Sequence, residues 1–175
     1  MKISDSGVAS HTRFIASPHS DFRARENDIR LIVIHNISLP PGQYGGNGII
    51  ELFTGKLDAR AHPYYADIAH LRVSSHFLIR RDGEVIQFVP CNKRAWHAGI
   101  SNWQGWDRCN DFSIGIELEG DDYTPFTDAQ YQHVNILVHA LQDRYPGTAL
   151  TGHSDIAPGR KTDPGPYFDW ARVVV

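Results

Sequence analysis

The sequence has little cysteine, no excess of positive charge and no long apolar run. Its two cysteines, Cys91 and Cys109, are too few for a disulfide framework. A net charge of −3 from 17 basic and 20 acidic residues gives no sign of a nucleic-acid footprint or a polybasic membrane anchor. The N-terminal segment MKISDSGVASHTRF lacks the apolar core of a signal peptide, and no apolar stretch reaches membrane-span length. We therefore expect a cytoplasmic monomer that binds neither nucleic acid nor membrane.

The length and the overall composition of the chain suit one folded domain. A chain of 175 residues with 41% apolar and 21% charged residues can bury one hydrophobic core, and it shows no repeat or low-complexity tract. Ten histidines are many for this length, which favours metal or acid–base chemistry without locating it. We expect a single domain over residues 1–175, with residues 1–28 as an irregular arm packed on it.

Three segments have strand patterns. The run LIVI at residues 31–34 is apolar on both faces, which is typical of a buried central strand, and His35 stands at its end. Residues 76–89 contain two β-rich runs joined around Asp82-Gly83, which predicts a hairpin. Residues 113–120 alternate, so Glu117 shares one face with serine and glycine while the isoleucines and the leucine occupy the other.

Two helices are expected between and after these strands. A short one at residues 49–55 follows a loop rich in Gly and Pro at residues 37–48. The clearer one begins at Thr127, which forms a capping box with Gln130, and ends before Pro146. Its apolar stripe consists of Val134, Leu137, Val138 and Leu141. Strands with helices between them indicate an α/β fold, in which helices flank a mixed central β-sheet.

The segment TGHSDIAPGRKTDPGP, residues 151–166, contains candidate metal ligands. Catalytic zinc sites use three protein ligands drawn from histidine and acidic residues and leave one position for water. His153 and Asp163 are ten residues apart in a loop that its prolines stiffen, which reduces the entropy lost in holding them. His35, at the end of a buried strand, is the best-placed third ligand. The alternative is an ordinary solvated turn, and spacing alone does not decide between the two.

Two further charged residues are candidates for chemistry. Glu117 has small neighbours on its strand face, which leave open space where water or a ligand can approach. The alternative is an edge strand with an outward-facing acid, as Glu119 also suggests. Lys161 lies between the two loop ligands and is placed to stabilise an oxyanion, although most lysines in such loops are surface residues.

The remaining histidines, tryptophans and cysteines give weaker signals. Trp96, His97 and Trp103 lie in a glycine-containing loop, where an aromatic ring can stack on a sugar or belong to the core. The two cysteines lack a CxxC partner, which favours packing over metal binding. The histidines interpreted as structural or surface residues are His62, His70, His76, His133 and His139.

Five segments in order resemble the zinc-dependent N-acetylmuramoyl-L-alanine amidases, from about Ser17 to Arg172. They are LIVIHNISLPPGQYGG, AHPYYADIAHLRVSSHFLIRRDGEVIQFVP, RAWHAGIS, RCNDFSIGIELEG and TGHSDIAPGRKTDPGP. The sequence is most similar to the AmpD-type branch, the cytoplasmic 1,6-anhydro-N-acetylmuramyl-L-alanine amidases of Gram-negative bacteria. The resemblance implies the mixed-sheet α/β fold that these amidases share with peptidoglycan-recognition proteins.

The resemblance also implies a role for each matching residue. His35, His153 and Asp163 match the ligands of a single Zn²⁺. Glu117 matches the acidic catalytic residue, and Lys161 matches the lysine that steadies the transition state. The positions that match substrate contacts are Asn36, Arg72, Trp96 and Arg108. Related proteins that bind peptidoglycan without cutting it have lost ligands, whereas the full set is present here.

The implied reaction is zinc-dependent hydrolysis of the amide between 1,6-anhydro-N-acetylmuramic acid and L-alanine of the stem peptide, in cell-wall recycling. By the same analogy, loss of the activity lets anhydromuropeptides accumulate, which in some bacteria induces a β-lactamase. Three alternatives remain open: a non-haem iron oxygenase, a module that binds peptidoglycan without cleavage, and a periplasmic or phage amidase that cuts intact wall. The helix expected at residues 127–145, the intact ligand set and the missing signal peptide argue against them in turn.

Overall fold

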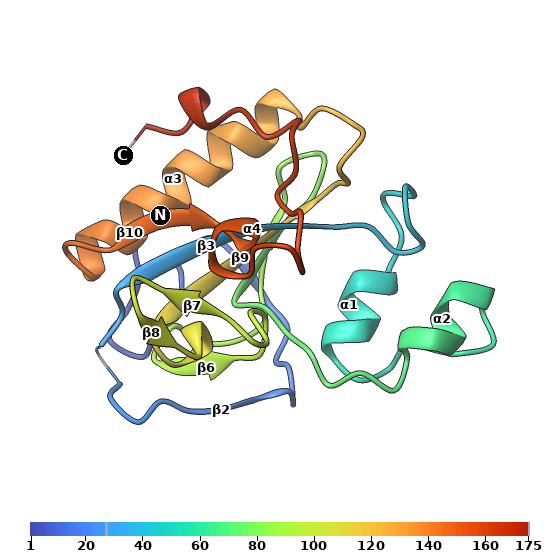
Figure 1. Ribbon diagram of the computed structural model, residues 1–175, viewed down its shortest axis with the longest axis horizontal. Coiled ribbons are helices and arrows are strands. Elements are labelled where there is room, and N and C mark those ends of the chain that lie inside the picture. The colour runs from blue at the N-terminus through green and yellow to red at the C-terminus, as the bar shows by residue number, and fades with distance from the viewer. Residues whose placement is uncertain (27, 175) are drawn as a thin grey trace.

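The computed structural model describes residues 1–26 and 28–174, and a six-stranded sheet forms its centre (Figure 1). In spatial order the strands are β1 (Arg13–Phe14), β5 (Val85–Gln87), β4 (Phe77–Ile79), β9 (Ser113–Glu119), β3 (Leu31–Ile37) and β10 (Ala149–Gly152). Strands β4, β9, β3 and β10 run parallel to one another, while β5 is antiparallel to β4. The sheet is therefore mixed, as the sequence predicts.

One face of the sheet packs against the long helix α3 (Asp128–Arg144) (Figure 1). The helix begins at Thr127 with the expected capping box, and its apolar stripe is fully buried. Across from it lie the alternate residues of the two central strands, among them Ile34 of β3 and Ile116 of β9. The side chains between them, such as His35 and Glu117, consequently point to the opposite face.

The opposite face is covered by shorter elements. Helix α1 (Gly48–Phe53) packs on β4 and β5 in a second apolar cluster, and α2 (Pro63–Ile68) follows it in the chain. Asn47 precedes α1 and Thr54 follows it, close to the bounds predicted from the sequence. The segment that holds α2 gave no clear pattern in the sequence, because its helix is short and only Tyr65 in it is buried.

Small elements close the lower end of the molecule in Figure 1. They include two small two-stranded sheets. One joins β2 (Ser20–Phe22) to β6 (Lys93–Ala95), and the other joins β7 (Asn102–Trp103) to β8 (Trp106–Asp107). The short helical turns are η1 (Cys109–Asp111), which follows β8 in the chain, α4 (His153–Ile156), near the centre of the view in Figure 1, and η2 (Trp170–Arg172), close to the C-terminus. Both cysteines are buried and free, in line with a packing role.

The structure corrects one expectation about the N-terminal region, residues 1–28, within which residue 27 lies outside the described residues. The region is not wholly irregular, because β1 extends the main sheet beside β5 and β2 pairs with β6. These strands are only two and three residues long, β1 is exposed and β2 is only partly buried, so their sequences carry no clear alternation. Within the described residues, no helix is long and apolar enough to cross a membrane.

Candidate active site

The pairing of three parallel strands brings the candidate residues together. His35 pairs with Glu117 across β3 and β9, so the two side chains are neighbours on one face of the sheet. Gly152 pairs with Ile34 on the other side of β3, which places His153, the next residue, beside His35. The loop after α4 then returns, and the amide of Ser154 donates to the carbonyl of Asp163 over 2.9 Å.

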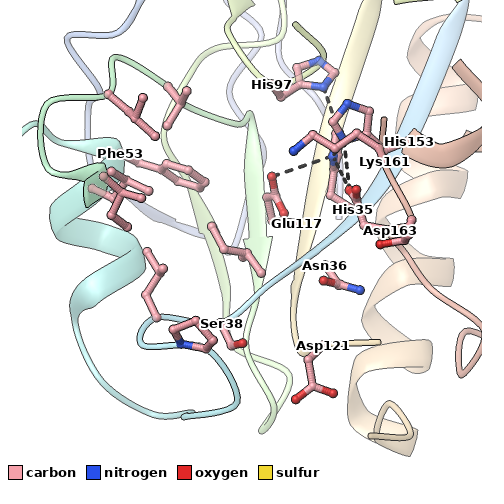
Figure 2. Close-up of a pocket in the computed structure, with 18 of the residues that line it drawn as sticks. His35, Asn36, Ser38, Phe53, His97, Glu117, Asp121, His153, Lys161 and Asp163 are labelled. Atoms are coloured by element: carbon pink, nitrogen blue, oxygen red, sulfur yellow. Dashed lines mark hydrogen bonds and ion pairs between the residues drawn. The ribbon is translucent and has the colours of Figure 1, made fainter. Parts of the chain in front are cut away.

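His35, His153 and Asp163 form a compact triangle of possible metal ligands (Figure 2). The Nδ1 atoms of the two histidines are 2.9 Å apart, and each lies 3.0 Å from Oδ2 of Asp163. Bonds of about 2.0–2.1 Å to a tetrahedral Zn²⁺ would separate such ligand atoms by about 3.3 Å. The donor set and its spacing therefore suit a tetrahedral Zn²⁺.

The pKa shifts of His35 and Asp163 also suit a bound cation. Burial lowers the pKa of His35 to about 4, so its imidazole is neutral at pH 7. Burial alone would raise the pKa of Asp163, but its contacts with the imidazoles of His153 and His35 outweigh burial and lower that pKa below its usual value. Neutral imidazole and ionised carboxylate are the forms that bind metals.

Glu117 stands beside the triangle as a buried carboxyl group with an unused oxygen. Its Oε1 lies 3.9 Å from Nδ1 of His35, while its Oε2 has no hydrogen-bond partner among the described residues. Burial raises its pKa well above the usual value, Asp163 adds to this, and Lys161 opposes it. A buried oxygen without a protein partner is costly, which indicates that a water, a substrate or an ion completes its contacts in the working site.

These residues form one wall of a cavity of about 590 Å³. Lys161 lines it as well, and Figure 2 shows its amine extending over the site. The facing wall is apolar and includes Leu52 and Phe53 of α1. A cavity with one polar catalytic wall and one apolar wall suits an amphipathic organic substrate.

The structure places two of the four expected substrate contacts in this cavity. Asn36 lines it, but its amide donates to Asp122 and to the carbonyl of Pro164, so it also braces the loop that carries Asp163. Trp96 lines it too, and its ring stacks with His19 at 6.1 Å between centroids.

The two arginines lie outside the cavity wall. The exposed guanidinium of Arg72 is 5.7 Å from the centre of the Trp96 ring, at the margin of the site. Arg108 is exposed, has a positive φ of 62° and pairs with Asp111 at 3.2 Å. Among the described residues, neither arginine belongs to the set that lines the cavity.

Two sequence-based interpretations on this strand face need correction. The open space expected above Ser113 and Gly115 is filled by the ring of His97, because a Cβ on Gly115 would lie 2.6 Å from that ring. Glu119 is not an outward-facing acid: it is 2% exposed and accepts hydrogen bonds from the amides of Gly45 and Arg81. The glycine in an otherwise bulky strand was the signal for His97, but it could not identify which side chain fills the gap.

The fold and site together place the protein in a known class. The chain belongs to the N-acetylmuramoyl-L-alanine amidase family, whose pattern matches residues 25–166, and it is therefore a hydrolase of amide bonds. The matched range contains the three possible ligands, Glu117 and Lys161. The oxygenase alternative loses its support, because those enzymes are built on a β-barrel, whereas this fold is a mixed sheet with helices.

Named relatives refine this class. The chain is 61% identical over 170 residues to the 1,6-anhydro-N-acetylmuramyl-L-alanine amidase AmpD of Citrobacter freundii, covering 96% of this chain and 91% of the relative. A crystal structure of an AmpD derivative superposes with a TM-score of 0.94 at 60% identity, over 96% of this chain and 95% of that one. Escherichia coli AmiD, solved with anhydro-N-acetylmuramic acid-L-Ala-D-γ-Glu-L-Lys, gives a TM-score of 0.60 at 31% identity, over 94% and 58%.

Proposed function

We propose that this protein is a zinc-dependent amidase that cleaves the bond between 1,6-anhydro-N-acetylmuramic acid and the L-alanine of the stem peptide. The observation that carries the proposal is the buried triangle of His35, His153 and Asp163, with the unpaired carboxylate oxygen of Glu117 beside it at the cavity wall. The high identity to AmpD over nearly the full length of both chains supports this substrate.

The triangle would hold one Zn²⁺ through Nδ1 of each histidine and Oδ2 of Asp163. When bound, the ion supplies Lewis acidity, which acidifies water and polarises a carbonyl group. Two neutral ligands and one anion leave a net positive site, which strengthens both effects.

Glu117 acts as the general base in this proposal. Its carboxylate takes a proton from the attacking water and then delivers a proton to the departing amine of L-alanine. The raised pKa of its buried carboxyl makes this return of the proton easier than it would be for an exposed glutamate. Lys161 extends its amine into the same cavity and stabilises the negative charge that develops on the carbonyl oxygen.

The rest of the cavity would hold the sugar and the stem peptide. Trp96 lines the cavity and would offer a ring face to the sugar. The side-chain nitrogen of Asn36 already donates to Asp122 and to the carbonyl of Pro164, so the side-chain oxygen of Asn36 would be the atom that meets the sugar. Arg72 and Arg108 lie beyond the wall, so they would contact carboxylates of the peptide that extends out of the cavity.

The cellular setting follows from the substrate. Anhydromuropeptides are turnover fragments of the cell wall, so we infer a recycling role in the cytoplasm. We also propose that residues 1–175 act as one zinc amidase domain, with the N-terminal region packed on it, and that the protein works as a monomer. The three ligands and Glu117 all come from one chain, which supports activity without a partner subunit.

Mass spectrometry of products tests the proposal. Purified protein is incubated with an anhydromuropeptide and, separately, with intact sacculi, each with and without a chelator. We expect release of free peptide from the anhydromuropeptide, loss of that release on chelation, and recovery with Zn²⁺. Full activity of rigorously metal-free protein would refute the metal mechanism. Equal cleavage of sacculi would favour an amidase of the intact wall, and intact substrate in every arm would favour a binding module.

A further inference from the structure

Both candidate histidine ligands use their outer ring nitrogen to contact one short segment of the chain. Nε2 of His35 lies 2.9 Å from Nδ1 of His97. Nε2 of His153 lies 3.0 Å from the carbonyl oxygen of Ala98. Two consecutive residues, His97 and Ala98, thus face the two imidazoles from the side opposite Asp163.

The contacts of this segment define which nitrogen of each ring carries a proton. A carbonyl oxygen only accepts, so Nε2 of His153 is the donor and its Nδ1 is free to bind a cation. Nε2 of His97 lies 3.1 Å from Oγ of Ser113. When that Nε2 donates to the hydroxyl, Nδ1 of His97 becomes an acceptor for the Nε2 proton of His35, and Nδ1 of His35 is left with its lone pair toward the triangle.

The segment is itself held from several directions. The side-chain oxygen of Asn110 accepts hydrogen bonds from the amides of both His97 and Ala98, over 3.1 and 2.8 Å. Gly115 lets the His97 ring lie directly on β9, since any larger residue would collide with it. Arg160 donates to the carbonyl of Ala98 over 2.7 Å. The acceptors are therefore fixed before any ligand arrives.

We propose that His97 and the Ala98 carbonyl form a positioning pair that sets the tautomer and orientation of both histidine ligands. The inference rests on the proposed zinc site and extends it to residues that do not bind the ion. Partners in this position typically change metal affinity by about 10–100-fold when they are removed. His97 is a positioning residue in this account, because it acts through His35 and needs no contact with the reacting atoms.

Two substitutions of His97 separate hydrogen bonding from shape. His97→Phe keeps a ring above Gly115 and removes the acceptor, whereas His97→Asn shortens the side chain and keeps an oxygen where Nδ1 lies. Zinc affinity is measured by competition with a chromophoric chelator, beside thermal unfolding of the metal-free proteins. We expect His97→Phe to bind zinc about 10–100-fold more weakly than the wild type and His97→Asn to retain most of the affinity, with similar metal-free unfolding temperatures.

A second measurement needs no substitution. Long-range ¹H–¹⁵N spectra of the zinc-loaded wild type report which ring nitrogens carry protons, and we expect protons on Nε2 of His35, His97 and His153. A proton on Nδ1 of His97, or coordination of zinc through Nε2 of His35, would overturn the proposal even where His97→Phe fails to fold. Wild-type zinc affinity in His97→Phe would also overturn it while leaving the amidase proposal intact. A wild type that binds no zinc would instead remove the proposed function and the positioning pair together.

Discussion

At the scale of single residues, the site keeps a group that is unfavourable for stability. Glu117 is 7% exposed and one of its oxygens has no partner among the described residues. Leaving a buried polar atom unsatisfied costs about 1–3 kcal/mol, and more when the group is charged. Such a residue makes physical sense at a place where a water or a substrate will later complete its hydrogen bonds.

The first residue-scale prediction concerns Glu117→Gln, which keeps the shape of the side chain and removes its ability to accept a proton. We expect kcat to fall by about 10²–10⁴, because positioned acid–base catalysis typically contributes that much. The acidic limb of the pH–rate profile, which reports protonation of the base, should disappear with it. Zinc content, measured by atomic emission, should stay at the wild-type value.

Two outcomes would contradict this role. Loss of zinc from Glu117→Gln would make Glu117 a ligand rather than a base. A near-normal kcat with zinc retained would place the base elsewhere, and His97 would be the next residue to test because it also lines the cavity.

The second residue-scale prediction concerns the two exposed arginines. Lysine at Arg72 or Arg108 keeps the charge but loses the forked geometry that grips a carboxylate with two hydrogen bonds. Losing one hydrogen bond to a charged group costs about 1.5–3 kcal/mol, so kcat/KM on a tripeptide substrate should fall roughly ten- to hundredfold for each variant. A substrate that ends at L-alanine serves as the control, since it lacks the distal carboxylates. Wild-type kcat/KM in both variants would make these arginines structural.

At the scale of elements, helix α3 holds one face of the sheet in place through a well-defined start. Oγ1 of Thr127 accepts from the amide of Gln130 over 3.1 Å and donates to the carbonyl of Arg81 over 2.7 Å. The same hydroxyl thus caps the helix and joins it to the turn of the β4–β5 hairpin.

We predict that Thr127→Ala lowers the free energy of unfolding by about 1–2 kcal/mol, since both the cap and the bond to Arg81 are lost. Thr127→Ser keeps the hydroxyl and should remain close to the wild type. Urea denaturation followed by circular dichroism measures both variants. Because α3 lies on the face away from the cavity, kcat under folding conditions should not change, and an equal loss of stability in Thr127→Ser would disprove the capping role.

The elements were predictable where one simple pattern governed them. The apolar run of β3, the alternation of β9 and the capped helix α3 follow directly from side-chain periodicity, and the structure confirms them. Strand β1 and helix α2 were not predictable, since both are short and mostly exposed and their form depends on neighbours distant in sequence.

The site was predictable to a similar extent. A ligand pair ten residues apart and a histidine at a strand end are readable from the chain, but their meeting depends on β10 pairing with β3, which no local pattern reports. The placement of His97 depends on a loop that folds back over Gly115, and the sequence showed only the gap that it fills.

At the scale of the whole molecule, a buried polar cluster joins the N-terminal region to the sheet. Arg23 is 7% exposed and donates to the carbonyl oxygens of Cys91, Asn110, Asp111 and Ser113. His76 lies 3.0 Å from this guanidinium, accepts from the amide of Gly115 at Nδ1 and faces the carbonyl of Lys93 with Nε2. Protonation of His76 would break the bond to Gly115 and place two positive charges together.

Stability should consequently depend on pH through His76. Burial, followed by the charge of Arg23, lowers the pKa of His76 well below its usual value. In the unfolded chain a histidine takes up a proton near pH 6.5, so below that pH the unfolded state binds more protons than the folded state. The free energy of unfolding should therefore fall with decreasing pH, by up to about 1.4 kcal/mol per pH unit for this residue, until the lowered pKa is reached.

Urea titrations of metal-free protein at several pH values between about 5 and 8 test this dependence. His76→Asn keeps an acceptor for Gly115 and cannot be protonated, so its stability should fall less steeply below pH 6.5 than that of the wild type. His139→Asn, on the exposed side of α3, is the matched control and should follow the wild-type slope. Parallel slopes in all three proteins would show that His76 does not titrate between the two states.

The pairing of β10 with β3 also has a consequence during protein synthesis. His35 leaves the ribosome early, whereas the two other proposed ligands belong to helix α4 and the loop after it, which emerge after helix α3 and strand β10. A nascent chain cannot assemble the triangle until β10 has been made and has docked at the edge of the sheet. Tight zinc capture by stalled nascent chains, each extended by a linker that spans the exit tunnel, should therefore appear only once residues 149–163 have emerged, and chains that end before Asp163 should not show it.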